Sequence, residues 1–243
     1  MKVQYAPWEK RNLGITSYEI AIEQEDSPEE LKRKLLEIED AEYIVVKTPV
    51  NNKAFIWAMP EMGFTFVETQ VLLRVDKENY VPRPYPKEYQ GRITVRTVKD
   101  DMGIRRVMDH IGKEIFTTDR ISIDKIFTKT DAAKRYQNWT RDILERGGRI
   151  DEMFLDEVPV GFAIIPKNEG KIGFAGLAGL YEGYQGKHLG GAIFRTSIEG
   201  VLKGGCDCSC TGTSSNNFIS LRAHLKEGYT IDHLEYVYVK HGK

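Results

Sequence analysis

A glycine-rich segment, GYQGKHLGG at residues 183–191, separates a strand pattern from a helix pattern. Glycines let the main chain approach a ligand closely, and the free N–H groups at the start of a helix attract phosphate oxygens. Lys187 adds a positive charge. The segment has neither the Gly-Lys-Ser/Thr ending of a Walker loop nor the Rossmann spacing of glycines. Because such a turn is structural as often as functional, a second motif has to decide between the two.

Strand and helix patterns alternate on both sides of this loop. In the first part of the chain, Ser27, Pro28 and Glu30 have the spacing of a capping box with a proline at the first helical position. That part is predicted to be a β-α-β-α-β unit. In the second part, apolar residues recur at helical spacing over 103–115, 131–146 and 216–228, and strands are predicted at 93–98, 153–166, 172–181, 206–213 and 233–240.

Three prolines, Pro82, Pro84 and Pro86, alternate in a polar stretch and favour an extended segment with few hydrogen bonds. The charge changes sign near the same place: residues 1–90 hold 12 basic and 16 acidic residues, and residues 91–243 hold 23 and 20. We therefore predict a smaller domain at 1–80, a linker at 81–91 and a larger domain at 92–243.

The formal net charge of −1 argues against a dedicated nucleic-acid-binding protein. No apolar run approaches the ~18 residues that a membrane helix needs, and the N-terminus lacks the apolar core of a signal peptide. The expected location is therefore the cytoplasm, with no membrane or nucleic-acid partner. Cys206, Cys208 and Cys210 alternate along one predicted strand, which favours buried apolar positions over a metal site. No metal is expected.

The second motif is a helix that follows the loop at the right distance. It carries Asn217, Ser220, Ala223, His224, Lys226, Gly228 and Tyr229. Together with the loop, which runs from Gln185 to Gly190, it resembles the GNAT superfamily of acyl-CoA-dependent N-acyltransferases. The loop motif of that family is Q/R-x-x-G-x-G/A, and its helix motif is N-x-x-A-x-x-L-Y-x-K-x-G-F. The strand that opens at Ile93 also looks like a GNAT first strand, so the resemblance covers about residues 92–240.

This resemblance implies an α/β (α+β) GNAT fold with a mixed, splayed central sheet, preceded by a smaller, truncated GNAT-like β-α-β-α-β domain. It also implies acetyl-CoA as co-substrate, with loop amides on the pyrophosphate and a strand edge at 178–181 on the pantetheine. The N–H of Leu180 or Tyr181 would then polarise the thioester carbonyl. The implied cofactor-binding residues are Leu180, Tyr181, Gln185, Gly186, Lys187, His188, Leu189, Gly190, Gly191 and Asn217.

Two histidines depart from the usual GNAT pattern. His188 stands at the usual first glycine of the loop, which leaves open how well the main-chain amide there would bind the pyrophosphate. His224 stands where a tyrosine commonly protonates the leaving thiolate, although a subgroup that includes phosphinothricin-type enzymes is similar in having histidine here. Imidazole can donate that proton, or His224 can be a packing residue without chemistry. A base is also needed: Glu182 is our first candidate, and Asp119, Asp124, Asp151, Glu152 or a chain of water molecules are the alternatives.

An offset of 165 residues superimposes two parts of the sequence. Residues 51–75 laid over 216–240 give identities at Asn51, Asn52, Ala58, Gly63 and Thr65. Either these are two unrelated helix-Gly-strand units, each with a glycine C-cap, or the first part of the chain is a truncated copy of the second. The first part lacks a counterpart of the glycine-rich loop.

The layout of the whole chain is similar to that of TDP-fucosamine acetyltransferases, which acetylate the 4-amine of a nucleotide-linked sugar. The similarity rests on Trp8, Glu9, Asn12 and Gly14 and on an A-x-x-x-Y-x-x-W helix with Tyr136. It implies that Asp119, Arg120 and Tyr136 contact the acceptor.

The sequence therefore predicts acetyl transfer from acetyl-CoA to a small-molecule primary amine, first of all an amino sugar, nucleotide-linked in the narrower resemblance. The alternatives are acetylation of another small-molecule or antibiotic amine, and a non-catalytic acyl-CoA sensor. The final strand, at 234–240, is predicted to be a sheet edge, which would allow a homodimer.

Overall fold

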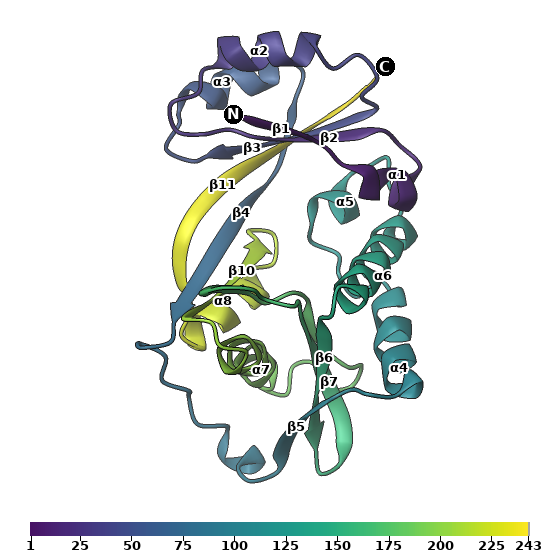
Figure 1. The fold of residues 1–243 in the computed structure, drawn as a ribbon, viewed down its shortest axis with the longest axis vertical. Helices are drawn as coiled ribbons and strands as arrows, with labels where there is room; N and C mark the ends of the chain where they lie inside the picture. Colours follow the sequence, from purple (N-terminus) through teal and green to yellow (C-terminus); the bar gives the residue numbers. More distant parts are fainter. Residues whose placement is uncertain (243) are drawn as a thin grey trace.

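The structure, a computed structural model, describes residues 1–242; residue 243, at the end of the larger predicted domain, lies outside them. Two sheets with packed helices make up the fold (Figure 1). The first part of the chain contains β1 (Lys2–Tyr5), α1 (Pro7–Leu13), β2 (Ser17–Ala21), α2 (Pro28–Leu36), β3 (Tyr43–Pro49), α3 (Ala54–Glu61) and β4 (Thr65–Asp76). The rest contains η1 (Lys87–Tyr89), β5 (Ile93–Thr97), α4 (Asp101–Gly112), α5 (Arg120–Ile123), α6 (Lys129–Glu145), β6 (Arg149–Leu155), β7 (Val158–Ile165), β8 (Ile172–Phe174), β9 (Ala178–Leu180), α7 (Gly190–Lys203), β10 (Cys208–Ser214), α8 (Phe218–Lys226) and β11 (Thr230–His241).

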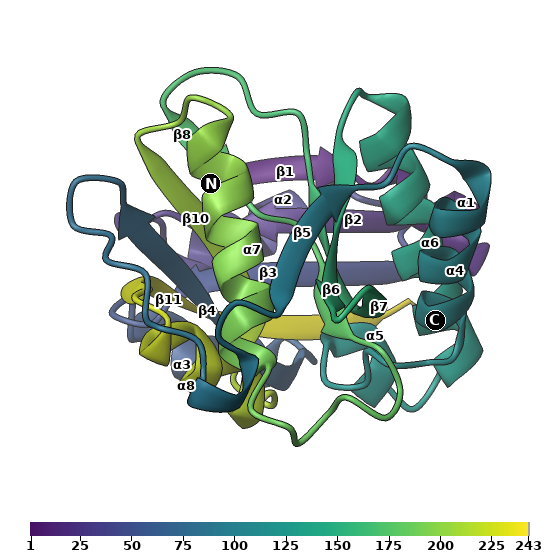
Figure 2. The same cartoon turned by 90° about the horizontal axis from the view of Figure 1, so that it is seen from below.

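The larger sheet is mixed, whereas the smaller one is antiparallel throughout. One has the order β1-β2-β3-β11-β4-β10-β8 and the other the order β5-β6-β7-β9. The pairs β2–β3 and β8–β10 are parallel, and the other pairs are antiparallel. This confirms the predicted α/β class with a mixed sheet. Helix α7 contacts β7, β9 and β10, and so joins the two sheets; Figure 2 shows it running alongside them.

Two long strands, β4 and β11, run between the upper and lower parts of the protein (Figure 1). In the large sheet β4 lies between β10 and β11, and β11 lies between β4 and β3. The prediction that the final strand is a sheet edge is therefore wrong, because residues 235–239 are paired on both sides. The long strand is held inside the sheet by partners from both parts of the chain.

The 165-residue repeat extends from the sequence to the strand pairing. Strand β3 pairs with β11 in the same way as β10 pairs with β4. The end pairs of the first ladder are Tyr43↔His241 and Pro49↔Glu235, and those of the second are Cys208↔Asp76 and Ser214↔Gln70. An offset of 165 converts each residue of one ladder into its counterpart in the other. This strand pairing crosses the predicted linker, and the division into domains at 1–80 and 92–243 stays a prediction.

The two halves of the repeat differ in what they bury. Under the same offset, His224 corresponds to Met59 and Tyr229 to Phe64. Met59 and Phe64 belong to an apolar core cluster that also includes Leu31. The first half therefore has a packed apolar core at the place where the second half has a buried histidine.

The two sheets separate at a single bulge between β8 and β9. The N–H of Ala175 still donates to Cys210 in β10, whereas Gly176 donates to Ile164 in β7, and Ile164 donates to Leu177. Two residues thus face one, as in a β-bulge, and the strand bends from one sheet to the other. A side chain at Gly176 would place its Cβ 2.7 Å from the Ile164 oxygen, so only glycine fits. The bend opens a V between β9 and β10, which confirms the predicted splay.

Candidate active site

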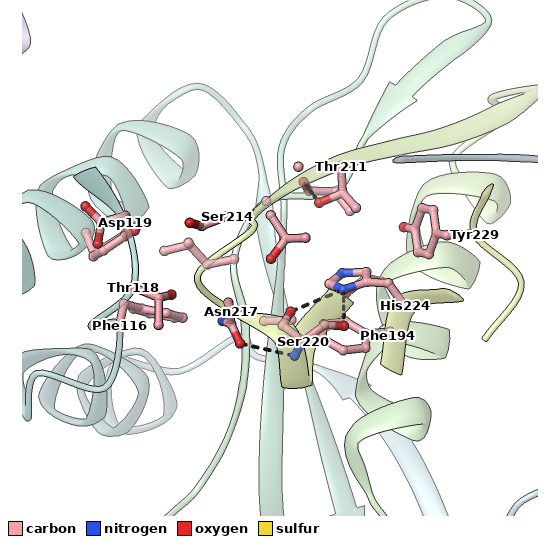
Figure 3. A pocket seen from close by; sticks show the side chains of 18 residues that line it. Phe116, Thr118, Asp119, Phe194, Thr211, Ser214, Asn217, Ser220, His224 and Tyr229 are labelled. Atoms are coloured by element: carbon pink, nitrogen blue, oxygen red, sulfur yellow. Dashed lines mark hydrogen bonds between the residues drawn. The ribbon is translucent and has the colours of Figure 1, made fainter. Parts of the chain in front are cut away.

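A cavity of about 150 Å³ lies in the V between β9 and β10. Figure 3 shows residues from the loop before α5, from β10 and from α8 around it. Four of the residues predicted from the sequence line it: Asp119, Tyr136, Asn217 and His224. The structure therefore brings two of the three candidate acceptor residues, Asp119 and Tyr136, together with the candidate catalytic histidine, up to 105 positions away in the chain.

His224 is nearly enclosed, with 6% of its surface exposed. Its ring stacks on Phe194 of α7 with the centroids 3.5 Å apart, and the edge of Tyr229 lies against it. Nδ1 lies 2.9 Å from the main-chain oxygen of Ser220 and 3.2 Å from its hydroxyl, contacts that Figure 3 marks by dashed lines. Stacking and hydrogen bonding together fix the ring in one orientation.

These contacts also fix the resting protonation state of His224. A carbonyl oxygen can only accept, so the bond to Ser220 places the proton on Nδ1. Burial lowers the pKa of His224 to about 4, and the bond to Ser220 opposes that shift only in part. The ring is therefore neutral at pH 7, with a free lone pair on Nε2. In this state Nε2 accepts a proton and does not donate one, which differs from the acid role implied by the resemblance.

Asn217 is the N-cap of α8, and its side-chain oxygen accepts the N–H of Ser220 at 3.1 Å. The cap holds the first turn of α8 in place, and that turn carries the carbonyl that orients His224. Asn217 thus lines the cavity and also acts as a structural cap.

The glycine-rich loop lies at the N-terminus of α7, outside the lining of the cavity. Within residues 1–242, no main-chain acceptor pairs with the N–H groups of residues 188–192. Gly186 has a φ of 75°, and His188 has a φ of 59°, a left-handed conformation that strains a non-glycine residue. His188 therefore keeps the glycine-like backbone of the motif. Lys187 lies over the ring of Tyr184, with Nζ 5.2 Å from its centroid.

The structure distinguishes the two candidate amide donors, Leu180 at the end of β9 and Tyr181 directly after it. The N–H of Tyr181 donates to Val160 at 2.9 Å and belongs to the ladder with β7. Leu180 is opposite Gly161 in a non-hydrogen-bonded pair, so its N–H points away from β7. Its carbonyl accepts from Nε2 of His110 at 3.0 Å, which anchors the strand to α4. Of the two, Leu180 has the available donor.

Most of the candidate bases lie elsewhere. Glu182 is exposed and pairs with Lys113, and it faces a second, shallow cavity beside α4. Asp124 bonds to His241. Asp151 is buried and accepts hydrogen bonds from Arg149 and Thr97. Glu152 is also buried and accepts hydrogen bonds from Arg106 and Tyr181. Asp119 is the one base candidate in the cavity lining, although its oxygens accept from the N–H of Ile121 and the hydroxyl of Ser122.

Arg120 does not face the cavity. Its guanidinium donates to Glu19 at 2.6 Å and to Glu9 at 3.2 Å, and Arg135 also donates to Glu9. The Arg120 side chain is only 11% exposed. Two carboxylates therefore neutralise it, and it joins α1 and β2 to α5 rather than presenting a charge to a substrate.

Sequence reasoning missed Phe194 and the role of Ser220. Phe194 and Ser220 act on His224, and the helical spacing of Ser220 four residues before the histidine was the available signal.

Comparison with models of protein families gives no match, and comparison with curated proteins gives none either. Solved structures do match. A GCN5-related N-acetyltransferase from Kribbella flavida is 14% identical, and the match covers 94% of this chain and 82% of that one, with a TM-score of 0.59. A tandem GNAT protein from the clavulanic acid biosynthesis pathway is 12% identical over 88% of this chain and 67% of that one, with a TM-score of 0.54. The chain has the GNAT fold.

Another GNAT structure that matches is a glucosamine N-acetyltransferase region of a fungal multi-domain β-N-acetylglucosaminidase. It is 10% identical, with 81% of this chain and 25% of that one covered and a TM-score of 0.58. These comparisons establish the fold. The narrower resemblance to TDP-fucosamine acetyltransferases stays a prediction.

The glycine-rich loop fits a diphosphate group. Its free N–H groups lie at the start of the 14-residue helix α7, where the helix dipole favours negative charge. Residues 183–191 contain Lys187 and no acidic residue. A Cβ placed at Gly190 would have only the Cβ of Ala223 nearby, at 3.8 Å, so a ligand can approach the main chain closely there.

Within the described residues, no group of three or more His, Cys, Asp or Glu side chains is arranged to hold a metal ion. None of the helices in residues 1–242 is both long and apolar enough to span a bilayer.

Proposed function

We propose that this protein is an acetyl-CoA-dependent N-acetyltransferase that acts on a primary amine. The observation that carries the proposal is the V between β9 and β10, which holds the cavity with His224 and has the loop with the free amides at one side. An anion site and a reactive site joined by a free strand edge suit an elongated acyl carrier with a diphosphate.

The residues that would hold acetyl-CoA follow from this geometry. The amides of residues 188–192, with Lys187, would bind the diphosphate, and the free edge of β9 would bind the amide groups of the pantetheine arm. Bound there, acetyl-CoA supplies an activated thioester. The free N–H of Leu180 is the donor that would stabilise negative charge developing on the acyl oxygen.

His224 would handle the proton. The amine reacts as the neutral species and loses one proton as its bond to the acyl carbon forms. Nε2, which carries the free lone pair, accepts that proton and returns it to the departing thiolate. The Ser220 carbonyl stabilises the imidazolium while it exists, because it already accepts from Nδ1. His224 would thus act first as the base and then as the acid, and the second role is the one that the resemblance implies.

We further propose an amino sugar as the acceptor. The whole-chain layout predicts this class, and the fungal GNAT region described as a glucosamine N-acetyltransferase supports it. The hydroxyl-bearing lining residues Thr118, Ser214 and Tyr136 suit a polar, uncharged sugar ring.

The experiment is release of free thiol from acetyl-CoA, measured across a panel of amino sugars, other small amines and peptides. The proposal expects thiol release that depends on one acceptor class, with the acetylated amine detected by mass spectrometry. Tight CoA binding without thiol release for any acceptor would contradict an enzymatic function and favour an acyl-CoA sensor. Release with simple amines but not with amino sugars would overturn the acceptor class alone.

A further inference from the structure

One wall of the cavity lies across from helix α7. It consists of Phe116, Thr118, Asp119 and Tyr136. Figure 3 shows the first three on the far side of the cavity from Phe194, a residue of α7. The glycine-rich loop opens at the start of α7, so acetyl-CoA would reach the cavity from the α7 side. The amine would then meet the acyl group from the side of these four residues, which we call the acceptor wall.

The backbone of the acceptor wall is irregular over most of its length. Residues 113–119 belong to no helix or strand, and α5, which follows them, has only four residues. The ring of Phe116 packs on that of Tyr136, with the centroids 4.6 Å apart. The side-chain amide of Asn216 donates to the main-chain oxygen of Thr118 at 3.4 Å. The position of the wall therefore depends on side-chain contacts with neighbouring elements rather than on a strand ladder.

An arginine adjoins the acceptor wall at each of two places in the chain. Arg120 directly follows Asp119. Arg135 directly precedes Tyr136. Both guanidinium groups donate to Glu9 of α1, Arg135 at 2.8 Å and Arg120 at 3.2 Å. One carboxylate from the first part of the chain thereby holds α5 and α6, the two helices next to the wall.

These ion pairs are buried. Glu9 is 0% exposed, and the side chains of Arg120 and Arg135 are 11% and 17% exposed. Charged hydrogen bonds are strong and directional, and removal of one partner of a buried pair leaves an uncompensated charge. Arg120 has a second carboxylate, Glu19, at 2.6 Å, whereas Arg135 donates to both oxygens of Glu9. Loss of the Glu9 charge should therefore move Arg135, and Tyr136 with it, more than Arg120.

We propose that Glu9 is a positioning residue for the acceptor: through Arg120 and Arg135 it fixes the acceptor wall relative to His224. This inference rests on the proposed acetyltransferase function. Misplacing a bound reactant by about 1 Å can lower its rate of reaction by about 100-fold, so a small shift of the wall matters. Helix α1 lies in the first part of the chain, which thus contributes to the reaction although it lacks a glycine-rich loop of its own.

A second ion pair between the same two helices provides a matched control. Arg11 of α1 donates to both oxygens of Asp142 in α6, each at 2.8 Å. The side chain of Arg11 is 48% exposed, and neither residue adjoins the acceptor wall in the chain. Arg11→Gln therefore loosens the contact between α1 and α6 without acting on the wall.

The test compares wild type with Glu9→Gln, Arg135→Gln and Arg11→Gln. Arg135→Gln is the milder variant, because Glu9 keeps its bond from Arg120. Thiol release from acetyl-CoA is measured with glucosamine and with 1,4-diaminobutane as acceptors. Calorimetry with CoA shows that each variant is folded. Hydrogen–deuterium exchange of residues 113–123 and 129–137 reports directly on the wall, with or without turnover.

We expect Glu9→Gln to lower kcat/KM for the acceptor at least about tenfold and to leave the KM for acetyl-CoA unchanged. Arg135→Gln should act in the same direction, and the double variant should lose less than the sum of the two single losses, because the residues act as one pair. Exchange in the two wall segments should be faster in both variants. Arg11→Gln should match wild type in kcat/KM and in the exchange of these segments.

The results that overturn the inference differ from those that overturn the proposed function. A wild-type kcat/KM in the folded variants, an equal loss in Arg11→Gln, or a parallel rise in the KM for acetyl-CoA contradicts the positioning role, while thiol release upholds the acetyltransferase. No thiol release from wild type with any acceptor contradicts the proposed function. Faster exchange confined to the Glu9 and Arg135 variants then still supports the hold of Glu9 on the wall, and unchanged exchange contradicts both.

Discussion

Nδ1 of His224 lies 2.9 Å from the main-chain oxygen of Ser220, one turn earlier in α8. The carbonyl can only accept, so this contact puts the ring proton on Nδ1 and leaves Nε2 as a proton acceptor. A residue expected to act as an acid thus rests in the form of a base. The proposed mechanism uses Nε2 for both steps, and this makes His224 the residue on which turnover should depend most.

We predict that His224→Phe lowers kcat by about 100-fold or more, since general acid–base catalysis typically contributes 10²–10⁴. Phenylalanine can keep the stack on Phe194, so the affinity for acetyl-CoA should stay close to that of wild type. Steady-state kinetics and calorimetry measure the two quantities. His233→Phe is the control, because His233 is exposed on β11. Wild-type kcat in His224→Phe would leave His224 a packing residue.

The low pKa of His224 also predicts a loss of stability in acid. The pKa is about 4 in the folded protein, against about 6.5 for an unperturbed histidine. Between those values the unfolded chain binds a proton that the folded chain does not, so stability falls as the pH drops from about 6.5 towards about 4. The slope from this group is at most ~1.4 kcal/mol per pH unit.

Urea denaturation at pH 7.5, 6.0 and 5.0 measures this effect. The free energy of unfolding of His224→Phe should fall less steeply over that range than that of wild type. Parallel curves for the two proteins would mean that His224 titrates normally in the folded state.

The free N–H of Leu180 predicts a different result for two neighbouring proline substitutions. Leu180→Pro removes a donor that the ladder with β7 does not use, so kcat should fall by about 10²–10³, the usual effect of losing an oxyanion donor. Tyr181→Pro removes the bond to Val160, so it should lower the melting temperature instead. Kinetics and thermal unfolding of both variants separate the two effects. A normal kcat in a folded Leu180→Pro variant would exclude this donor.

The motifs predicted the site better than the side-chain directions around it. The order of loop and helix placed Gly190 and His224 correctly on α7 and α8, because these motifs fix local backbone shape. Glu182 and Arg120 were expected at the site, but they point to Lys113 and to Glu9 and Glu19. Sequence spacing indicates which residues are near a loop, and it does not indicate which partner a flexible charged side chain will take.

The strand arrangement was only partly predictable for a similar reason. The identities between residues 51–75 and 216–240 pointed to two related units. The sequence did not show that β4 of the first unit pairs with strands of the second, or that β11 of the second unit pairs with β3 of the first. Each strand has a local pattern that suits any apolar neighbour.

This exchange of strands between the units predicts the behaviour of a shortened chain. Residues 92–243 expressed alone would lack β4, which lies between β10 and β11 in the full protein. The exposed ladders should make this fragment unfolded or aggregated, and residues 1–80 added in trans should restore soluble material. Circular dichroism and size-exclusion chromatography measure both outcomes. A folded, monomeric fragment 92–243 would show that β4 is dispensable for the second half.

Binding of acetyl-CoA at the N-terminus of α7 is the central claim, and calorimetry of wild type and Gly190→Glu tests it most directly. The new side chain has space, since the nearest atom to a Cβ at Gly190 is that of Ala223 at 3.8 Å, but it brings a carboxylate to the proposed diphosphate site. Wild type should bind one acetyl-CoA per chain, and Gly190→Glu should bind at least about 100-fold more weakly, while Lys203→Glu at the other end of α7 binds as wild type. Equal affinity in wild type and Gly190→Glu would contradict the account.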